Sequence, residues 1–218
     1  MKDMILNELC RDYTVRRRNV EPYAVLKKAG MTFNISAYEI EGLGSMSVID
    51  MSAMAGLMSM ESFILAAEEK DAPLFSGDYI EAGGTCTLLY EFYDNMLSPL
   101  DEDSAAAYRQ VKARYADLPP HETEPRWYDS IRYDFTLGAS DKSLATRKEE
   151  ITSAYFAAYR ENLRRADTVD PAAKRAKTAA YVDGLFSNGG PAVDQFKTLF
   201  GEETAREIFE KYVFFCKA

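Results

Sequence analysis

The stretch between residues 31 and 94 constrains the fold more than any other part of the chain. It contains five short segments that carry β-branched and aromatic residues and are separated by glycine or by Ala-Pro: residues 32–41, 45–52, 59–66, 76–81 and 85–94. Connections this short allow hairpins, whereas parallel strands need long crossover connections. This part of the chain therefore predicts a mainly antiparallel β-sheet.

Helical patterns flank the predicted strands. Residues 3–29 and 99–117 have apolar spacing or boundary signals typical of helices, and everything after about residue 141 is helical in pattern. Residues 125–140 alternate in a way that predicts one further strand. The order predicts a single α+β domain over residues 1–218, an α/β/α sandwich with helices covering a central sheet.

The charge balance limits the kinds of partner that the protein can bind. The net charge of −9 argues against general nucleic-acid binding, because neutralising phosphates needs a basic surface. Basic residues nevertheless cluster in two runs, at residues 16–18 and 160–177. Each run is either a solvated face or a local patch for an acidic partner or for ligand carboxylates.

Cysteine and histidine usage excludes several kinds of site. The three cysteines are far apart and form no CxxC pair, so neither a disulfide framework nor a zinc site is supported. His121 is the single histidine, and its proline-rich loop predicts simple solvent exposure. The chain starts without a secretory pattern and lacks a stretch of roughly 20 apolar residues, so we expect a cytoplasmic protein that does not bind membranes.

The predicted strand at residues 85–94 has two chemically different faces. Alternation places Cys86, Leu88, Tyr90 and Phe92 on an apolar face, and Thr87, Leu89, Glu91 and Tyr93 on a mixed one. Glu91 is thus either a pocket acid with hydroxyl groups beside it or an exposed residue on the solvent face of the sheet.

Three groups of residues resemble the ferredoxin-dependent bilin reductases. The first is Ala72-Pro-Leu-Phe-Ser-Gly-Asp-Tyr-Ile80, followed by Gly83-Gly84 and the strand that ends in Asp94. The second is Pro125-Arg-Trp127 with Ser130. The third comprises Ala179-Ala-Tyr-Val, the loop 188–191, Phe200-Gly-Glu-Glu-Thr-Ala and Tyr212-Val-Phe-Phe215. The resemblance covers roughly residues 45–218, in matching order, and it implies a central antiparallel sheet with helices on both faces.

The resemblance also implies a function. Proteins of this family reduce linear tetrapyrroles with electrons from ferredoxin, and they bind no metal or flavin for this purpose. The expected partners are therefore a bilin and a ferredoxin. Two alternatives remain: a protein of the same fold that binds a tetrapyrrole or another flat ligand without reducing it, and a related enzyme with a different substrate.

Site residues are assigned from the resemblance position by position. The proton-donating acid of the family maps to Glu91, and a second acidic pocket residue maps to Asp50. The position where some members carry a histidine falls on Glu61, or on Ser62 after a shift of one residue. A catalytic loop acid maps to Gly190, where Asn188 or Asp194 are possible substitutes.

Further ligand contacts are expected around these acids. Thr87, Leu89 and Tyr93 share the face of Glu91 and are predicted to bind the substrate. A bilin carries two carboxylates, which need positive partners. By residue type alone the candidates are Arg147, Arg160, Arg164 and Lys174.

Overall fold

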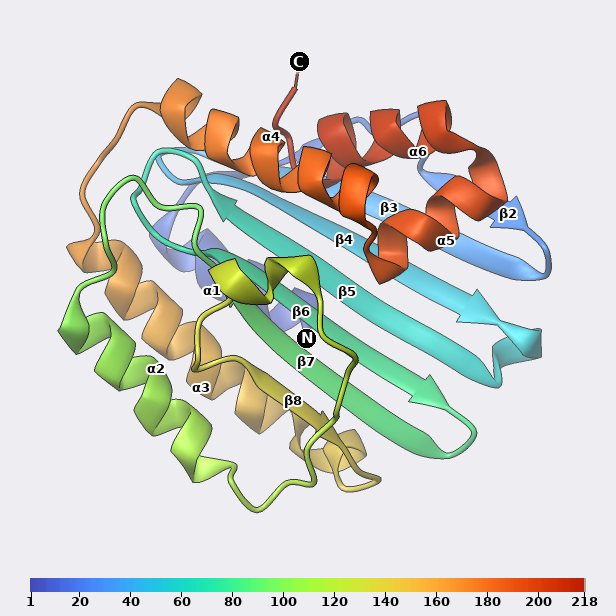
Figure 1. The fold of residues 1–218 in the computed structure, drawn as a ribbon, viewed down its shortest axis with the longest axis horizontal. Helices are drawn as coiled ribbons and strands as arrows, with labels where there is room; N and C mark the ends of the chain where they lie inside the picture. Colours follow the sequence, from blue (N-terminus) through green and yellow to red (C-terminus); the bar gives the residue numbers. More distant parts are fainter. Residues whose placement is uncertain (218) are drawn as a thin grey trace.

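The chain folds into three layers, with one sheet between two groups of helices (Figure 1). The computed structural model describes residues 1–217. In chain order the strands are β1 (Val15–Arg18), β2 (Val25–Lys28), β3 (Met31–Ile40), β4 (Gly44–Ala53), β5 (Met58–Ala67), β6 (Leu74–Ala82), β7 (Thr85–Tyr93) and β8 (Leu137–Ser140). They form an eight-stranded sheet of order β1-β3-β4-β5-β6-β7-β8, and β2 pairs with β3 as well. All of these pairings are antiparallel, so the predicted sheet type is confirmed.

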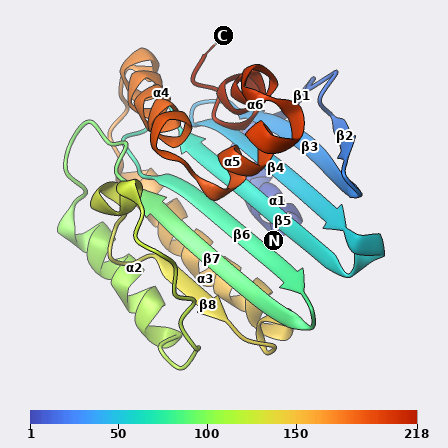
Figure 2. The ribbon, with the colours of Figure 1, turned by 45° about the vertical axis from the view of Figure 1, so that its right-hand side comes forward.

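Helices cover both faces of the sheet. Helices α1 (Lys2–Asp12), α2 (Glu102–Arg114) and α3 (Leu144–Arg165) lie on one face, and α4 (Pro171–Asn188), α5 (Pro191–Phe200) and α6 (Glu202–Ile208) lie on the other (Figure 2). Short helical turns occur at Met54–Gly56, Trp127–Ile131 and Phe209–Val213. Within residues 1–217, no helix has the length and apolar character that crossing a bilayer requires.

Strand alternation divides the apolar side chains between two cores. On β7, Leu88, Tyr90 and Phe92 are fully buried against the layer of α1, α2 and α3. Tyr93, the next residue along, belongs to the core beneath α4, α5 and α6. The two faces predicted for residues 85–94 are therefore confirmed, and Glu91 faces the layer that contains α4.

The prediction of one helix over residues 3–29 is wrong beyond Asp12. The chain instead forms β1 and β2, which pair with different parts of β3 at the edge of the sheet. Both strands are mostly exposed and carry basic residues, so they lack the apolar alternation that would have marked them. Pairing with a neighbouring strand, rather than local pattern, decides their conformation.

The prediction of a strand over residues 125–140 is also only partly right. Residues 137–140 form β8, which pairs with β7, while Trp127–Ile131 forms a tight helical turn. The aromatic residues of this segment serve different cores, since Trp127 packs near α4 and Phe135 is buried on the opposite face. The spacing of these aromatic residues resembles the alternation of a strand, although most of the segment does not form one.

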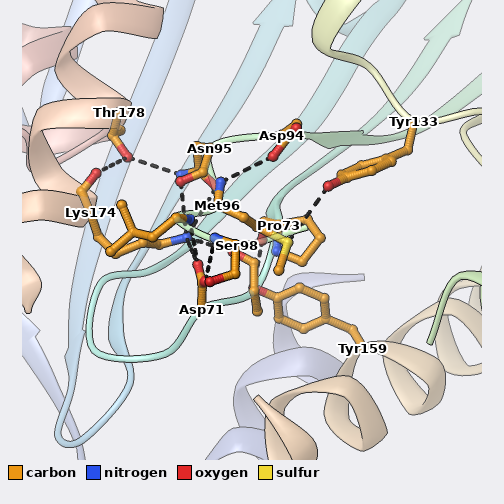
Figure 3. Close-up of polar contacts among 12 residues, drawn as sticks. Asp71, Pro73, Asp94, Asn95, Met96, Ser98, Tyr133, Tyr159, Lys174 and Thr178 are labelled. Atoms are coloured by element: carbon orange, nitrogen blue, oxygen red, sulfur yellow. Dashed lines mark hydrogen bonds and ion pairs between the residues drawn. The ribbon is translucent and has the colours of Figure 1, made fainter. Parts of the chain in front are cut away.

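A buried polar cluster fixes the N-terminal half of α4 to the end of the sheet (Figure 3). Lys174 is 1% exposed, and its Nζ donates to the carbonyl oxygens of Ala72 at 2.9 Å and Asn95 at 3.1 Å. Asp71 lies 3.5 Å from the same nitrogen and accepts two backbone N–H groups of the turn after β7. Asn95 Nδ2 donates to Thr178, one turn further along α4. These contacts hold α4 in place over the sheet.

Candidate functional site

A cavity of about 660 Å³ lies between the sheet and the layer of α4 and α5. Its floor is formed by side chains of β4 to β7, its roof by α4, α5 and the turn between them, and one side by residues 121–138. Its volume is within the range of small-molecule sites, roughly 300–1,000 Å³.

The centre of the floor carries an acid. Asp78 lies opposite Ser62 on β5 and opposite Leu89 on β7, and the side chains of all three line the cavity. The preceding residue, Gly77, points to the other face, where an added Cβ would lie 2.3 Å from the Phe63 ring. The glycine thus lets two aromatic rings fill the core directly behind the acid.

Asp78 is suited to hold a proton near neutral pH. Burial is the largest cause that raises the pKa of its carboxyl to about 6; the charge of Glu91 acts in the same direction, and a hydrogen bond with Ser62 opposes both. A proton donor works best when its pKa lies near the working pH. Sequence reasoning missed Asp78, although alternation along residues 76–81 places it on the face of Ser76 and Ile80, which also line the cavity.

Glu91 also lines the cavity, in a different electrostatic setting. One carboxylate oxygen lies 2.8 Å from Arg132 Nη1, and the other accepts a hydrogen bond of 2.7 Å from the hydroxyl of Tyr93. Arg132 in turn lies 2.8 Å from Asp129. Burial lowers the pKa of Arg132, but its bonds to Glu91 and Asp129 outweigh this and raise it. Both oxygens of Glu91 are thus already bonded to neighbouring side chains.

Aromatic rings form the wall beside Glu91. The ring centroids of Tyr93 and Tyr181 lie 5.0 Å apart, and those of Tyr93 and Tyr128 lie 5.7 Å apart. Trp127 closes this group from outside: its indole N–H donates to the carbonyl oxygen of Gly189 at 2.8 Å. Rings in this arrangement suit contact with a flat conjugated ligand.

The opposite end of the cavity is apolar. Met51, Met58 and Met60 project from β4 and β5 below Val193 and Phe196 of α5. Methionine side chains adapt to irregular apolar shapes. The cavity therefore has a methionine-lined end beneath α5 and a polar end beside residues 121–138.

The polar end carries basic side chains. Lys112, His121 and Arg126 line the cavity there, and Lys112 Nζ donates to the carbonyl oxygen of Asp134 at 2.6 Å. Within residues 1–217, none of the three side chains forms an ion pair with a carboxylate. The prediction that His121 is simply exposed is wrong, since it is half-buried and forms part of the wall.

The basic residues predicted by type to meet ligand carboxylates lie elsewhere. Arg147 pairs with Asp117, Arg164 pairs with Glu161, and Arg160 bonds to acids of α1. All three belong to α3, on the other side of the sheet. Lys174 is buried in the cluster that anchors α4, so none of the four lines the cavity.

Asp50 and Glu61 also project from the other face, so their assignment to the cavity is corrected. They lie opposite each other on β4 and β5, one residue out of phase with the floor. Asp50 pairs with Lys2 Nζ, and Glu61 accepts from the backbone N–H of Lys2 at 2.8 Å. Burial would raise the pKa of Glu61, but its bonds with the start of α1 outweigh this and lower it. A register error of one residue reverses the face of every side chain.

Of the remaining residues predicted to contact the ligand, some line the cavity and others do not. Ser62, Leu89 and Tyr93 line the cavity. Thr87 is on the correct face, but it lies beyond the cavity and bonds to Ser140. Asn188 is exposed at the end of α4 and does not line the cavity. Asp194 instead accepts from the backbone N–H of Gly190 and so stabilises the turn over the cavity.

The fold and the cavity define a class of protein: an α/β/α sandwich with an antiparallel sheet whose one face and overlying helices enclose a cavity. Among solved structures the chain is similar to phytochromobilin synthase from tomato in complex with biliverdin, with a TM-score of 0.78 and 15% sequence identity. The match covers 99% of this chain and 82% of that one. No protein-family model and no curated protein sequence matches the chain. At this identity the likeness shows the shared fold.

Proposed function

We propose that this protein binds a linear tetrapyrrole in the cavity and reduces it with electrons from a ferredoxin. The observation that carries the proposal is Asp78, an acid on the cavity floor whose pKa is raised to about 6 and which forms no ion pair with any other residue of the described range 1–217. The shared fold with a protein that holds biliverdin supports the choice of ligand.

Asp78 and Glu91 have different chemical roles in this proposal. Electrons from a ferredoxin arrive one at a time, and each reduced state of the ligand becomes easier to protonate. Asp78 donates the proton from below the ligand plane and is reloaded from water. Glu91, held by Arg132 and Tyr93, supplies a fixed negative charge that attracts the pyrrole N–H groups.

The shape and chemistry of the cavity suit such a ligand. A bilin is flat, largely apolar and carries two carboxylates on one edge. The methionine-lined end and the tyrosine wall would cover its rings, while Lys112 and Arg126 stand at the polar end, where carboxylates would be neutralised.

Binding without reduction is the second candidate. Glu91 supports it, because both of its oxygens are already bonded and it cannot readily serve as a second donor. The two candidates share the ligand and differ only in whether the bound ligand changes when electrons are supplied.

An absorption titration with biliverdin tests both candidates. We expect a red-shifted bound spectrum that bleaches or converts when a reduced ferredoxin system is added without oxygen. A bound spectrum that stays constant on reduction favours the binding protein, and an unchanged spectrum on titration refutes both.

Two tryptophan variants tie the result to the cavity. Leu89→Trp places a large ring on the floor beside Asp78 and should abolish the spectral shift. Leu57→Trp makes the same chemical change at a residue that is 73% exposed on the β4–β5 hairpin, and should bind as the unmodified chain does. Equal loss in both variants would indicate general damage rather than a blocked cavity.

A further inference from the structure

His121 is held against the sheet as a strand residue would be. Pro120 pairs with Ala139 of β8 in antiparallel fashion, Ser140 N donates to the carbonyl oxygen of Pro119 at 3.0 Å, and His121 N donates to that of Gly138 at 3.0 Å. The segment thus extends the sheet beyond β8. Its backbone is fixed, although the proline-rich sequence suggests a free loop.

This pairing places His121 on the same transverse row of the sheet as Asp78. Asp78 lies opposite Leu89, Leu89 lies opposite Gly138, and Gly138 lies opposite His121. Paired residues of antiparallel strands project to the same face. Three strand spacings separate the backbones of Asp78 and His121, which is about 14 Å.

Little side-chain bulk stands between Asp78 and His121 on this row. Gly138 has no side chain, and an added Cβ would lie 3.4 Å from both Leu89 Cδ2 and the carbonyl oxygen of His121. Leu89 provides the only side chain between them on this row, and it is apolar. A flat ligand lying over β6, β7 and β8 can therefore contact the carboxyl of Asp78 near its middle and the imidazole of His121 near its edge.

We propose that His121 contacts the ligand and supplies the second proton of the reduction. This inference rests on the proposed function. Saturating one C=C bond of the ligand breaks its π bond and forms two bonds to hydrogen, which takes two electrons and two protons. The ferredoxin supplies the electrons in two steps, the Asp78 carboxyl gives one proton, and an imidazole N–H of His121 gives the other; water reloads both.

Other charged groups share the cavity with His121. Lys112 and Arg126 are basic, Asp134 and Asp129 are acidic, and the floor contributes Glu91 and Arg132 besides Asp78. Glu91 and Asp129 bond to Arg132, and Asp134 bonds to Arg109. Within residues 1–217 the side chain of His121 forms no hydrogen bond or ion pair with another side chain, so its imidazole is free to meet a ligand.

The single histidine makes a direct test possible. Nitrogen-15 spectra of the labelled chain contain one imidazole, and saturation with biliverdin should shift its resonances. The same saturation should leave them shifted in Asp78→Asn, because contact with His121 does not need the floor acid. An imidazole spectrum that is unchanged by bound biliverdin would overturn the proposal.

Turnover supplies the second test. His121→Gln should slow the reduction by about a hundredfold, far more than it weakens biliverdin binding, and accumulate a partly reduced ligand radical visible by electron paramagnetic resonance. Glu122→Gln alters the adjacent exposed side chain outside the cavity and should behave as the unmodified chain. Normal turnover and products in His121→Gln would refute the role. Failure of the unmodified chain to bind biliverdin would instead refute the proposed function itself.

Discussion

Arg132 Nη1 lies 2.8 Å from Glu91 Oε1, while the other oxygen of Glu91 accepts a hydrogen bond from Tyr93. Both oxygens of Glu91 are therefore already bonded. Asp78 lies on the same floor and forms no ion pair within the described part of the chain, and burial raises its pKa to about 6. The two acids therefore have different settings: Asp78 can exchange a proton near neutral pH, whereas Glu91 is held by its two partners.

This division predicts different losses of activity in two amide variants. Asp78→Asn removes the donor and should lower bilin turnover by about a hundredfold or more. Glu91→Gln keeps the donor and should cost only about tenfold. The alkaline limb of the pH–rate profile, along which Asp78 loses its proton, should shift to lower pH, since the charge of Glu91 helps raise the pKa of Asp78. Single-turnover kinetics across pH 5–9 would show this. A greater loss in Glu91→Gln than in Asp78→Asn would reverse the assignment.

The raised pKa of Asp78 also predicts a pH-dependent stability. The folded pKa of about 6 lies above the ordinary value of 3.8, so the native state binds the proton more tightly and loses stability as pH rises between these values. Asp78→Asn should remove this penalty. We expect it to be more stable than the unmodified chain at pH 7.5, by at most about 3 kcal/mol, with a smaller difference at pH 4. Urea unfolding at both pH values measures the effect; an equal difference at both would contradict it.

Part of this site could be predicted from the sequence. Alternation along residues 85–94 correctly separated Glu91 from the apolar face, although it left open whether the residue is exposed or lies in a pocket. Asp50 was assigned from the resemblance alone, and this assignment failed; on β4 a run of mostly buried residues hides the phase. His121 could not be found, since its position depends on pairing with β8, a contact that no local pattern encodes.

The buried Lys174 predicts a large effect on stability. Lys174→Met leaves Asp71 without its cation and removes the bonds to Ala72 and Asn95, so unfolding should become easier by about 3–5 kcal/mol. Lys177→Met changes an exposed residue of the same helix and should have an effect within about 0.5 kcal/mol. Chemical denaturation compares the two.

A double variant separates the ion pair from packing. Lys174→Met with Asp71→Asn should lose less than the sum of the single changes, because the second change removes the unpaired charge. Strict additivity would show that the two side chains contribute independently.

The two basic runs differ in their capacity to dock an acidic ferredoxin. Arg160, Arg164 and Arg175 already pair with acids, whereas Arg17 on β1 has no such partner within residues 1–217. We expect the rate of reduction by ferredoxin to fall as ionic strength rises. Arg17→Glu should lower the association rate by about tenfold at low salt, and Arg164→Glu should leave it unchanged. Stopped-flow measurements at equal protein concentrations compare the association rates of the two variants. A rate that does not depend on salt refutes docking by charge.

The close contact between Gly184 of α4 and Trp127 predicts the effect of a larger residue in the roof of the cavity. A Cβ at this position would lie 2.3 Å from Cη2 of Trp127, whose indole N–H bonds to Gly189. Gly184→Ala should therefore displace the ring and destabilise the protein by about 1–3 kcal/mol, although alanine in a helix interior is otherwise about 1 kcal/mol better than glycine.

The single tryptophan reports this change directly. Fluorescence of Gly184→Ala should shift to the red as the indole loses its bond to Gly189 and meets water. Trp127→Phe in the same background supplies a smaller ring, so the double variant should recover part of the lost stability. If Gly184→Ala alone were more stable than the unmodified chain, helix propensity would outweigh the contact, and Trp127 would not be what requires glycine at this turn of α4.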